Sequence, residues 1–202
     1  MNYPNGSKPK PNNSSKMVKK PKMANKAHLG IDFEDLINQS NTYYLEKDRA
    51  VIYKKPTPIR ITKVDYPSRN RARIIEAFYQ VPSTTDYNGI YRGKYIDFEA
   101  KSCNGKSFSF THLYAHQINH LIRVARHGGI AFLIIMFNDF REVFMLPVEK
   151  LESFYLASLE GGRKSISYEV FKTDGYPIKI GLNPALSYLD TVDMVYFSNM
   201  EE

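Results

Sequence analysis

The sequence predicts an α/β domain, and three consecutive segments near its middle indicate this class. Residues Lys94–Lys101 alternate between apolar and polar side chains, as a half-buried strand does. Residues Ile130–Phe137 are apolar throughout, which is typical of a strand buried on both faces. The segment between them has helical periodicity and ends at Gly128-Gly129, a common helix stop. Strands and helices that alternate along a chain of 202 residues favour one α/β domain.

The flanking elements follow from the same patterns of apolar side chains, caps and turn residues. Asn88-Gly89 and Arg92-Gly93 are turn signals before the strand at Lys94, and Cys103 is predicted to lie in a loop. The other predicted elements are a helix at Leu29–Asp48, strands at Ala50–Tyr53, Pro58–Val64, Ile74–Val81 and Lys106–Phe110, a helix capped by Thr111, a strand at Arg141–Leu146 and a helix at Val148–Leu159. Residues 1–28 are rich in Pro, Asn, Ser, Lys and Gly, so we expect a disordered tail before a domain at 29–202.

The composition disfavours several classes of protein. The single cysteine excludes an intramolecular disulfide and a cysteine-built zinc site, and it is typical of a reducing cytoplasm. No apolar run approaches the roughly 20 residues that a membrane-spanning helix needs. The basic N-terminus lacks the apolar segment of a secretory signal. We therefore expect a cytoplasmic protein.

Positive charge is concentrated in two segments of a chain with 28 basic and 21 acidic residues and a net charge of +7. Residues 1–31 contain seven lysines and no acid, and residues 54–75 contain seven basic residues against Asp65 alone. The basic residues of the second segment are Lys54, Lys55, Arg60, Lys63, Arg69, Arg71 and Arg73. A single charge run is usually a solvated face, but two runs on an otherwise acidic body favour a polyanionic partner. Nucleic acid is preferred over membrane phosphates because no basic amphipathic helix is evident.

Asp86, Glu99 and Lys101 form the candidate chemical site. Glu99 and Lys101 lie side by side, because residues two apart on a strand point the same way. Asp86 precedes Glu99 by 13 residues with turn signals between, so two adjacent strands can bring the carboxylates together. Two carboxylates suit Mg²⁺, and a nearby ammonium can orient the attacking water or neutralise charge on the pentacovalent phosphate. The alternative is an exposed structural ion pair, because acid-x-Lys motifs are frequent by chance.

A longer string makes the enzyme interpretation more specific. Residues 84–101, TTDYNGIYRGKYIDFEAK, closely resemble the signature of RecU-type Holliday junction resolvases, which belong to the PD-(D/E)xK nuclease superfamily. The similarity covers roughly residues 29–200 and continues in KKPTP at 54–58, HQ at 116–117, GRKSI at 162–166 and YF at 196–197. Thr85 stands where the superfamily usually has Pro before the first Asp.

The resemblance implies a restriction-endonuclease-like core, a mixed β-sheet flanked by helices, in a protein that acts as a homodimer. It also implies a protruding basic stalk at about residues 59–82 that enters the centre of a four-way junction. The DNA-binding residues would include Lys54, Lys55, Arg69, Arg71 and Arg73. The ligands of Mg²⁺, for which Mn²⁺ can substitute, would be Thr84, Asp86, Glu99 and Gln117. Lys101 would stabilise the transition state, and paired symmetric nicks would leave 5′-phosphate ends.

A few further side chains are candidates for roles near the site. Glu34 on the first helix would help at the active site, as an acid early in the first helix does across the superfamily. Gln117 lies at the edge of an apolar helical stripe, where it can face a site beside the sheet. The histidines spaced by four, His112, His116 and His120, have a zinc-binding spacing, but they lie opposite the apolar face, which favours a solvated or DNA-facing side. Asp97 is more typical of a structural ion pair than of a metal ligand.

The resulting hypothesis is a Mg²⁺-dependent, structure-selective DNA endonuclease that resolves Holliday junctions in recombination and repair. It would act in the cytoplasm at the nucleoid, with a recombinase as a candidate further partner. Two alternatives stay open. One is a nuclease of the same core that cleaves linear duplex, and the other is a non-catalytic junction- or nucleic-acid-binding protein.

Overall fold

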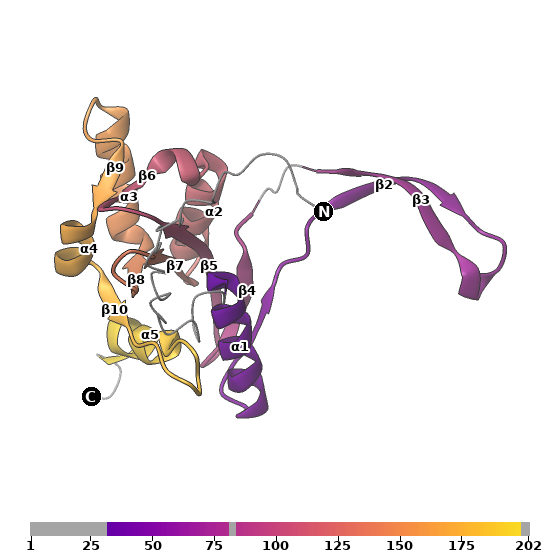
Figure 1. Cartoon of the computed structure of the whole chain (residues 1–202), viewed down its shortest axis with the longest axis horizontal. Helices are drawn as coiled ribbons and strands as arrows, with labels where there is room; N and C mark the ends of the chain where they lie inside the picture. Colours follow the sequence, from indigo (N-terminus) through magenta and orange to yellow (C-terminus); the bar gives the residue numbers. More distant parts are fainter. Residues whose placement is uncertain (1–31, 81–83, 199–202) are drawn as a thin grey trace, which may run out of the picture. The chain divides into compact units, whose positions relative to one another are not determined.

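The computed structural model describes residues 32–80 and 84–198, so the predicted N-terminal tail lies outside the described residues (Figure 1). The strands are β1 Val51–Lys54, β2 Ile59–Asp65, β3 Arg73–Tyr79, β4 Tyr87–Tyr91, β5 Lys94–Cys103, β6 Ser107–Ser109, β7 Ile130–Phe137, β8 Glu142–Pro147, β9 Ser165–Ser167 and β10 Tyr176–Ile178. The helices are α1 Phe33–Glu46, α2 Ala115–Arg126, α3 Val148–Leu159, α4 Tyr168–Asp174 and α5 Tyr188–Tyr196, with 3-10 turns η2 Arg69–Arg71 and η3 Phe110–His112.

Within the described residues, a six-stranded mixed sheet has the order β1-β4-β5-β7-β8-β10. Strands β5 and β7 are parallel, joined by a crossover that contains α2, and the other neighbouring pairs are antiparallel. Strands β2 and β3 form a separate hairpin, and β6 pairs with β9. The predicted α/β class, with a mixed sheet flanked by helices, is confirmed.

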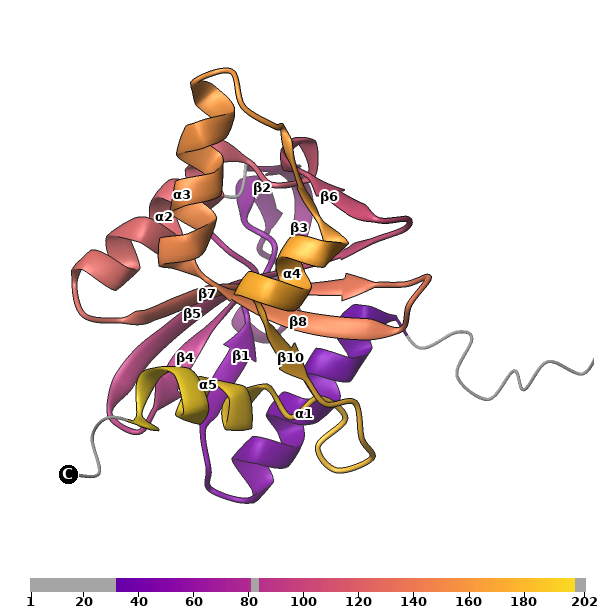
Figure 2. The same ribbon diagram turned by 90° about the vertical axis from the view of Figure 1, so that its left-hand side faces the viewer.

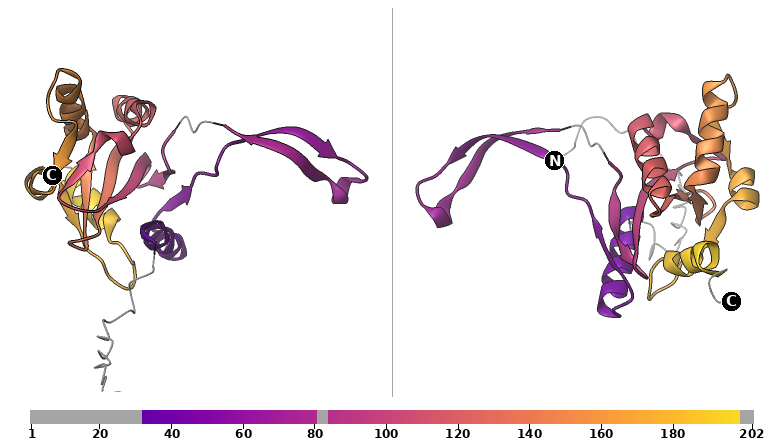
Figure 3. Two further views of the ribbon diagram at one scale, coloured as in Figure 1. Left: turned by 45° about the horizontal axis from the view of Figure 1, so that its top comes forward. Right: turned by 180° about the vertical axis from the view of Figure 1, so that it is seen from behind.

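Helices cover both faces of the sheet (Figures 2 and 3). Helices α1 and α5 pack on one face, with a core that includes Ile37, Phe98 and Leu189. Helices α2, α3 and α4 pack on the other face, around Ile118 and Phe171. The alternation predicted for β5 is confirmed, because its apolar side chains enter the first core and its polar ones face α2. Strand β7 supplies both cores, which explains its unbroken apolar sequence.

Three local predictions are wrong. Asn88-Gly89 lies inside β4, and only Arg92-Gly93 makes the turn into β5, with φ values of +47° and +74°. Thr111 does not cap α2, because its N–H donates to the Ser109 hydroxyl at 3.2 Å in the separate turn η3. Cys103 is the last residue of β5, buried and paired with Phe137, and does not lie in a loop.

Gly89 is required where β1 and β4 approach each other. A Cβ built on it would lie 2.0 Å from the Val51 carbonyl oxygen and 2.6 Å from the Ile52 Cα, and both are backbone atoms that cannot move alone. We expect Gly89→Ala to destabilise the protein by roughly 1–3 kcal/mol or more, as overpacking does. Gly105→Asn is the matched control, since Gly105 has a φ of +77° that Asn tolerates and open space around it. Thermal unfolding of both variants checks this, and equal stability would contradict the close approach.

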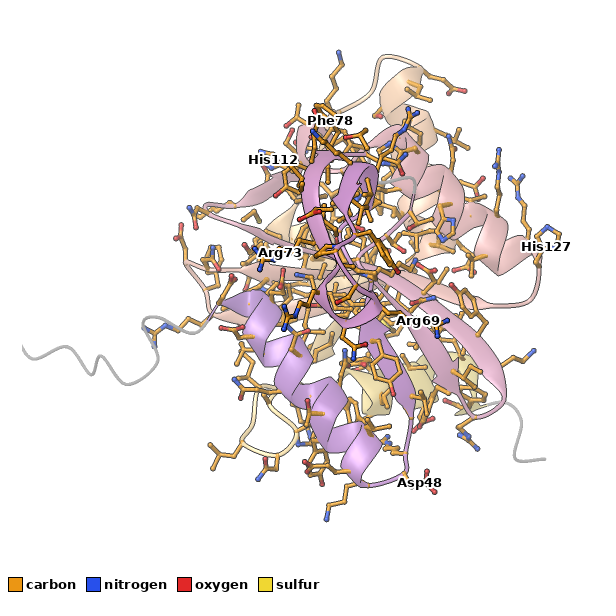
Figure 4. All side chains as sticks on the ribbon, turned by 90° about the vertical axis from the view of Figure 1, so that its right-hand side faces the viewer. Asp48, Arg69, Arg73, Phe78, His112 and His127 are labelled. Atoms are coloured by element: carbon orange, nitrogen blue, oxygen red, sulfur yellow. The ribbon has the colours of Figure 1, made fainter. Side chains whose placement is uncertain are left out.

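The β2–β3 hairpin carries its side chains in solvent along both strands. Its turn, η2, holds Arg69 and Arg71, and β3 begins at Arg73 (Figure 4). Large apolar side chains are also exposed on it, including Phe78 and Tyr79 at 57% and 85%. A two-stranded ribbon that buries nothing gains little from the hydrophobic effect, so its sequence is explained better by a ligand than by a core.

None of the helices in the described parts of the chain has the length and apolar character needed to cross a membrane.

Candidate active site

The β4–β5 register brings the predicted carboxylates together. Tyr87 at the start of β4 lies opposite Phe98, so Asp86, the residue before β4, lies next to Glu99. The Asp86 backbone N–H donates to Glu99 Oε2 at 3.1 Å, and the Ala100 N–H donates to Asp86 Oδ2 at 3.4 Å. The structure therefore joins the two acids through one strand pair, as the spacing of 13 residues predicts.

Lys101 lies between the two acids. Its ammonium donates to Glu99 Oε1 in a short ion pair and lies 3.9 Å from Asp86 Oδ2. The Glu99 carboxylate is fully buried, whereas Asp86 and Lys101 are partly exposed. Glu99 and Lys101 therefore do form an ion pair, but it is not an exposed one, because the Glu99 side chain is fully buried.

The surroundings of Glu99 raise the pKa of its carboxyl group. Burial, followed by the negative charge of Asp86, raises the pKa of Glu99 from its usual value of 4.5 to about 7, although Lys101 opposes the rise. A buried carboxylate whose pKa is raised by a neighbouring carboxylate favours a bound cation, which would remove the repulsion. The donor set is hard oxygen, which suits Mg²⁺ or Mn²⁺ better than softer metals.

A metal at this position would have few protein ligands. Across residues 32–80 and 84–198, no group of three or more His, Cys, Asp or Glu side chains is arranged to hold an ion. Two carboxylates with waters and substrate oxygens are a normal shell for Mg²⁺, which keeps much of its hydration. The residues present therefore fit a divalent cation held mainly by Asp86 and Glu99.

The raised pKa of Glu99 predicts how stability changes with pH. A carboxyl whose pKa is higher in the folded state contributes stability that is complete below pH 4.5 and is lost as pH rises toward 7. We expect metal-free Glu99→Gln to gain melting temperature relative to the wild type between pH 5 and pH 8. At pH 8, Mg²⁺ should raise the melting temperature of the wild type and leave that of Glu99→Gln almost unchanged. A pH-independent difference between the two proteins would contradict the assignment.

Gln117 contacts the site from α2. Its Nε2 donates to Glu99 Oε1 at 2.6 Å, and its Oε1 accepts the Tyr114 backbone N–H at 3.1 Å. Both ends of the amide are therefore engaged, and the nitrogen faces the carboxylate. The sequence predicted Gln117 beside the site, and its position agrees; its role as a metal ligand stays a prediction.

Thr84 and Glu34 lie beside Asp86 in a cleft of about 250 Å³. The cleft is lined by Glu34, Lys54, Lys55, Pro56, Thr57, Pro58, Thr84, Thr85 and Asp86. Glu34 lies in the first turn of α1, where its carboxylate pairs with the Lys54 ammonium. The cleft is thus lined by two acids, Glu34 and Asp86, and by the two chain segments that lead to and from the hairpin.

The predicted DNA-binding residues fall into two groups. Arg69, Arg71 and Arg73 lie on the hairpin, exposed, and form no ion pair with any residue in the described ranges. Lys54 and Lys55 differ, because Lys54 pairs with Glu34 and Lys55 is mostly buried against Asp97. The arginines are therefore free to meet phosphates, while both lysines already have anionic partners.

Sequence reasoning missed the hydrogen-bonded network around Asp97. The predicted ion pair of Asp97 exists, with the Lys55 ammonium at 2.9 Å, but the carboxylate also accepts from Thr85, Tyr95 and His120. The period of two along β5 was the available signal, because it places Asp97 on the face of Glu99. His120 turns toward Asp97, while the ring of His116 stacks on Tyr114 with centroids 5.5 Å apart.

A mixed sheet in which an Asp just before one strand meets a Glu and a Lys within the neighbouring strand is the arrangement of the PD-(D/E)xK class of nucleases. The family model described as Recombination protein U, RecU, matches residues 28–194. The chain belongs to the RecU family.

Curated relatives agree along nearly the whole chain. A protein of Pediococcus pentosaceus named Holliday junction resolvase RecU is 46% identical over 196 residues, which is 96% of each chain. A protein of the same name from Bacillus cereus is 44% identical over 198 residues, 97% of this chain and 98% of the relative. A solved structure of Hjc, a Holliday junction resolvase of Archaeoglobus fulgidus, has 15% identity and a TM-score of 0.40, covering 70% of this chain and 94% of that one.

Proposed function

We infer that this chain is a DNA endonuclease that resolves four-way junctions and needs a divalent metal ion. The observation that carries this function is the meeting of Asp86, Glu99 and Lys101 in a chain of the RecU family, whose relatives are named Holliday junction resolvases. The pair of acids is the part of the site that a merely binding protein would not need, because burying Glu99 beside Asp86 is unfavourable without a cation.

The chemistry assigned to the residues is hydrolysis of a phosphodiester bond. Asp86 and Glu99 would hold Mg²⁺, with Thr84 and Gln117 completing the ligands. Bound Mg²⁺ supplies Lewis-acid stabilisation of charge on the phosphate and lowers the pKa of water. The Lys101 ammonium, beside both acids, orients the attacking water and offsets negative charge that develops on the scissile phosphate. Gln117 keeps Glu99 in place through its N–H donor.

A labelled synthetic junction tests this function. The protein is incubated with a four-way junction, and separately with a linear duplex of the same sequence, with and without Mg²⁺. We expect cleavage of the junction only when Mg²⁺ is present, with products that ligase can reseal. Equal cleavage of the duplex would indicate a nuclease of other specificity, and binding without cleavage at any metal concentration would indicate a non-catalytic junction-binding protein.

Paired nicks call for two sites, so we extend the proposal to a homodimer that cuts symmetrically opposed strands and leaves 5′-phosphate ends. A cruciform plasmid distinguishes paired from single cuts, because paired cuts linearise it and single cuts only relax it. Analytical ultracentrifugation of the active protein gives the oligomeric state. We place this activity at the nucleoid in the cytoplasm, where a recombinase is the proposed further partner.

The hairpin arginines are proposed to grip junction phosphates, together with Lys54, Lys55 and the N-terminal lysines. Each neutralised phosphate releases counterions, so affinity should fall steeply with salt. Replacing Arg69, Arg71 and Arg73 by Ala should lower the slope of log affinity against log salt by about 2.7 per engaged hairpin, at roughly 0.9 per contact. The control replaces the exposed Lys47, Lys172 and Lys179, which removes the same charge. Fluorescence anisotropy at several salt concentrations measures the slope for both triple variants. Equal slopes would contradict the proposal that the hairpin arginines bind phosphates.

A further inference from the structure

Asp97 has more hydrogen-bond partners than a structural ion pair requires. Its side chain has no solvent exposure. One oxygen, Oδ1, accepts a short hydrogen bond from the Thr85 hydroxyl. The other, Oδ2, accepts from the Lys55 ammonium at 2.9 Å, the Tyr95 hydroxyl at 2.8 Å and His120 Nε2 at 3.0 Å. A buried carboxylate is stabilised by several such donors, since each satisfies part of its lost hydration.

Two of these donors come from the two ends of the hairpin insertion, the segment between β1 and β4 that contains β2 and β3. Lys55 directly follows β1, and Thr85 lies 30 residues later, just before β4. The Lys55 ammonium also donates to the Thr85 hydroxyl at 2.8 Å, and the Lys55 backbone N–H donates to the Asp86 carbonyl at 2.7 Å. The segment that leaves the sheet at Lys55 and the segment that returns to it at Thr85 therefore lie side by side. Asp97 on β5 contacts both.

The place where these two segments meet borders the candidate site. Thr85 immediately precedes Asp86, and Asp97 lies two residues before Glu99 on the same face of β5. His120 on α2 is one helical turn after Gln117, which donates to Glu99. Any movement of Thr85 away from Asp97 would carry Asp86 away from Glu99, because the residues are adjacent in the chain.

We propose that Asp97 is a positioning residue that clamps both ends of the hairpin insertion to β5 and so holds Asp86 beside Glu99. This inference rests on the proposed nuclease function, because its consequence is measured as cleavage. An apolar residue could fill the same volume, and buried ion pairs are poor sources of stability. A carboxylate, however, can join Lys55, Thr85 and His120 at one place, which an apolar side chain cannot do.

The test compares Asp97→Asn with the double variant Asp97→Asn/Lys55→Met. The single variant leaves the Lys55 ammonium without its buried anion, so it should lower the melting temperature. It should also lower the single-turnover cleavage rate of a saturated four-way junction by about 100-fold, the loss that a misplacement of about 1 Å can cause. The double variant removes the unpaired charge, so its melting temperature should recover, but its cleavage rate should stay low because no clamp remains. Junction affinity of Asp97→Asn should stay within a few-fold of the wild type.

Glu169→Gln is the matched control, since this exposed carboxylate pairs with Lys172 on α4, and it should cleave normally. Thr85→Val removes only the hydroxyl link and should lower cleavage while keeping the Lys55–Asp97 pair. Cleavage that recovers with melting temperature in the double variant, or wild-type cleavage by Asp97→Asn, would overturn the proposal. If the double variant stays unstable, hydrogen exchange decides: faster exchange confined to residues 54–58 and 84–87 supports the clamp, and faster exchange throughout the sheet overturns it. Glu99→Gln is measured in parallel, because normal cleavage by that variant would refute the proposed active site itself.

Discussion

Replacing Glu99 by Gln is expected to abolish cleavage of the junction while leaving binding intact. The amide keeps the size of the carboxylate but not its charge, so the pair with Asp86 can no longer hold a divalent cation. Loss of about 4 kcal/mol of transition-state stabilisation, a reasonable contribution for a catalytic metal, corresponds to a decrease of roughly 1,000-fold. Single-turnover kinetics with excess enzyme measure the chemical step, and anisotropy measures affinity.

The control for this experiment is Glu46→Gln, which changes an exposed glutamate near the end of α1. Its rate should match that of the wild type. Because the pKa of Glu99 is about 7 in the metal-free protein, wild-type cleavage at limiting Mg²⁺ should also rise with pH through this range as the proton leaves. Cleavage by Glu99→Gln at more than a tenth of the wild-type rate would refute the assigned site.

Replacing Lys101 by Met is expected to lower the cleavage rate by about 100- to 1,000-fold, the usual effect of removing one charge-stabilising donor. Met has an unbranched side chain of similar length, so packing on β5 changes little, while the ammonium beside Glu99 and Asp86 is lost. Lys101 also lowers the pKa of Glu99, so the rising limb of the pH profile should move to higher pH. Rate constants at saturating Mg²⁺ measure the loss of rate, and rate constants at limiting Mg²⁺ and several pH values measure the shift of the pH profile.

Lys106→Met serves as the control, because this exposed lysine lies in the turn after β5 and before β6. It should leave both rate and pH profile unchanged. A Lys101→Met protein with a normal rate would indicate that the ammonium only compensates for the buried charge of Glu99. A lower rate without a shift in the pH profile would mean that Lys101 acts on the phosphate alone.

The acids and the lysine could be predicted because their arrangement depends on local geometry. Period-two alternation on β5 places Glu99 beside Lys101 whatever the rest of the fold does. The turn at Arg92-Gly93 sets the register that brings Asp86 to Glu99. The same local reasoning failed at Asn88-Gly89, where the sequence of a common turn lies within a strand because β1 needs a residue without a side chain.

The chain by itself therefore determined the class of fold, the strand pair of the site and the distribution of charge between tail, hairpin and body. Only the tertiary structure decided that Glu99 is fully buried, that Gln117 faces it with its amide nitrogen, and that Asp97 joins Lys55, Thr85 and His120. These contacts lie between residues far apart in sequence, and alternation or helical periodicity reports only the face on which a side chain lies. Which residue contacts the side chain on that face, and how much water that residue excludes, depends on the packing of α2 and β4 against β5.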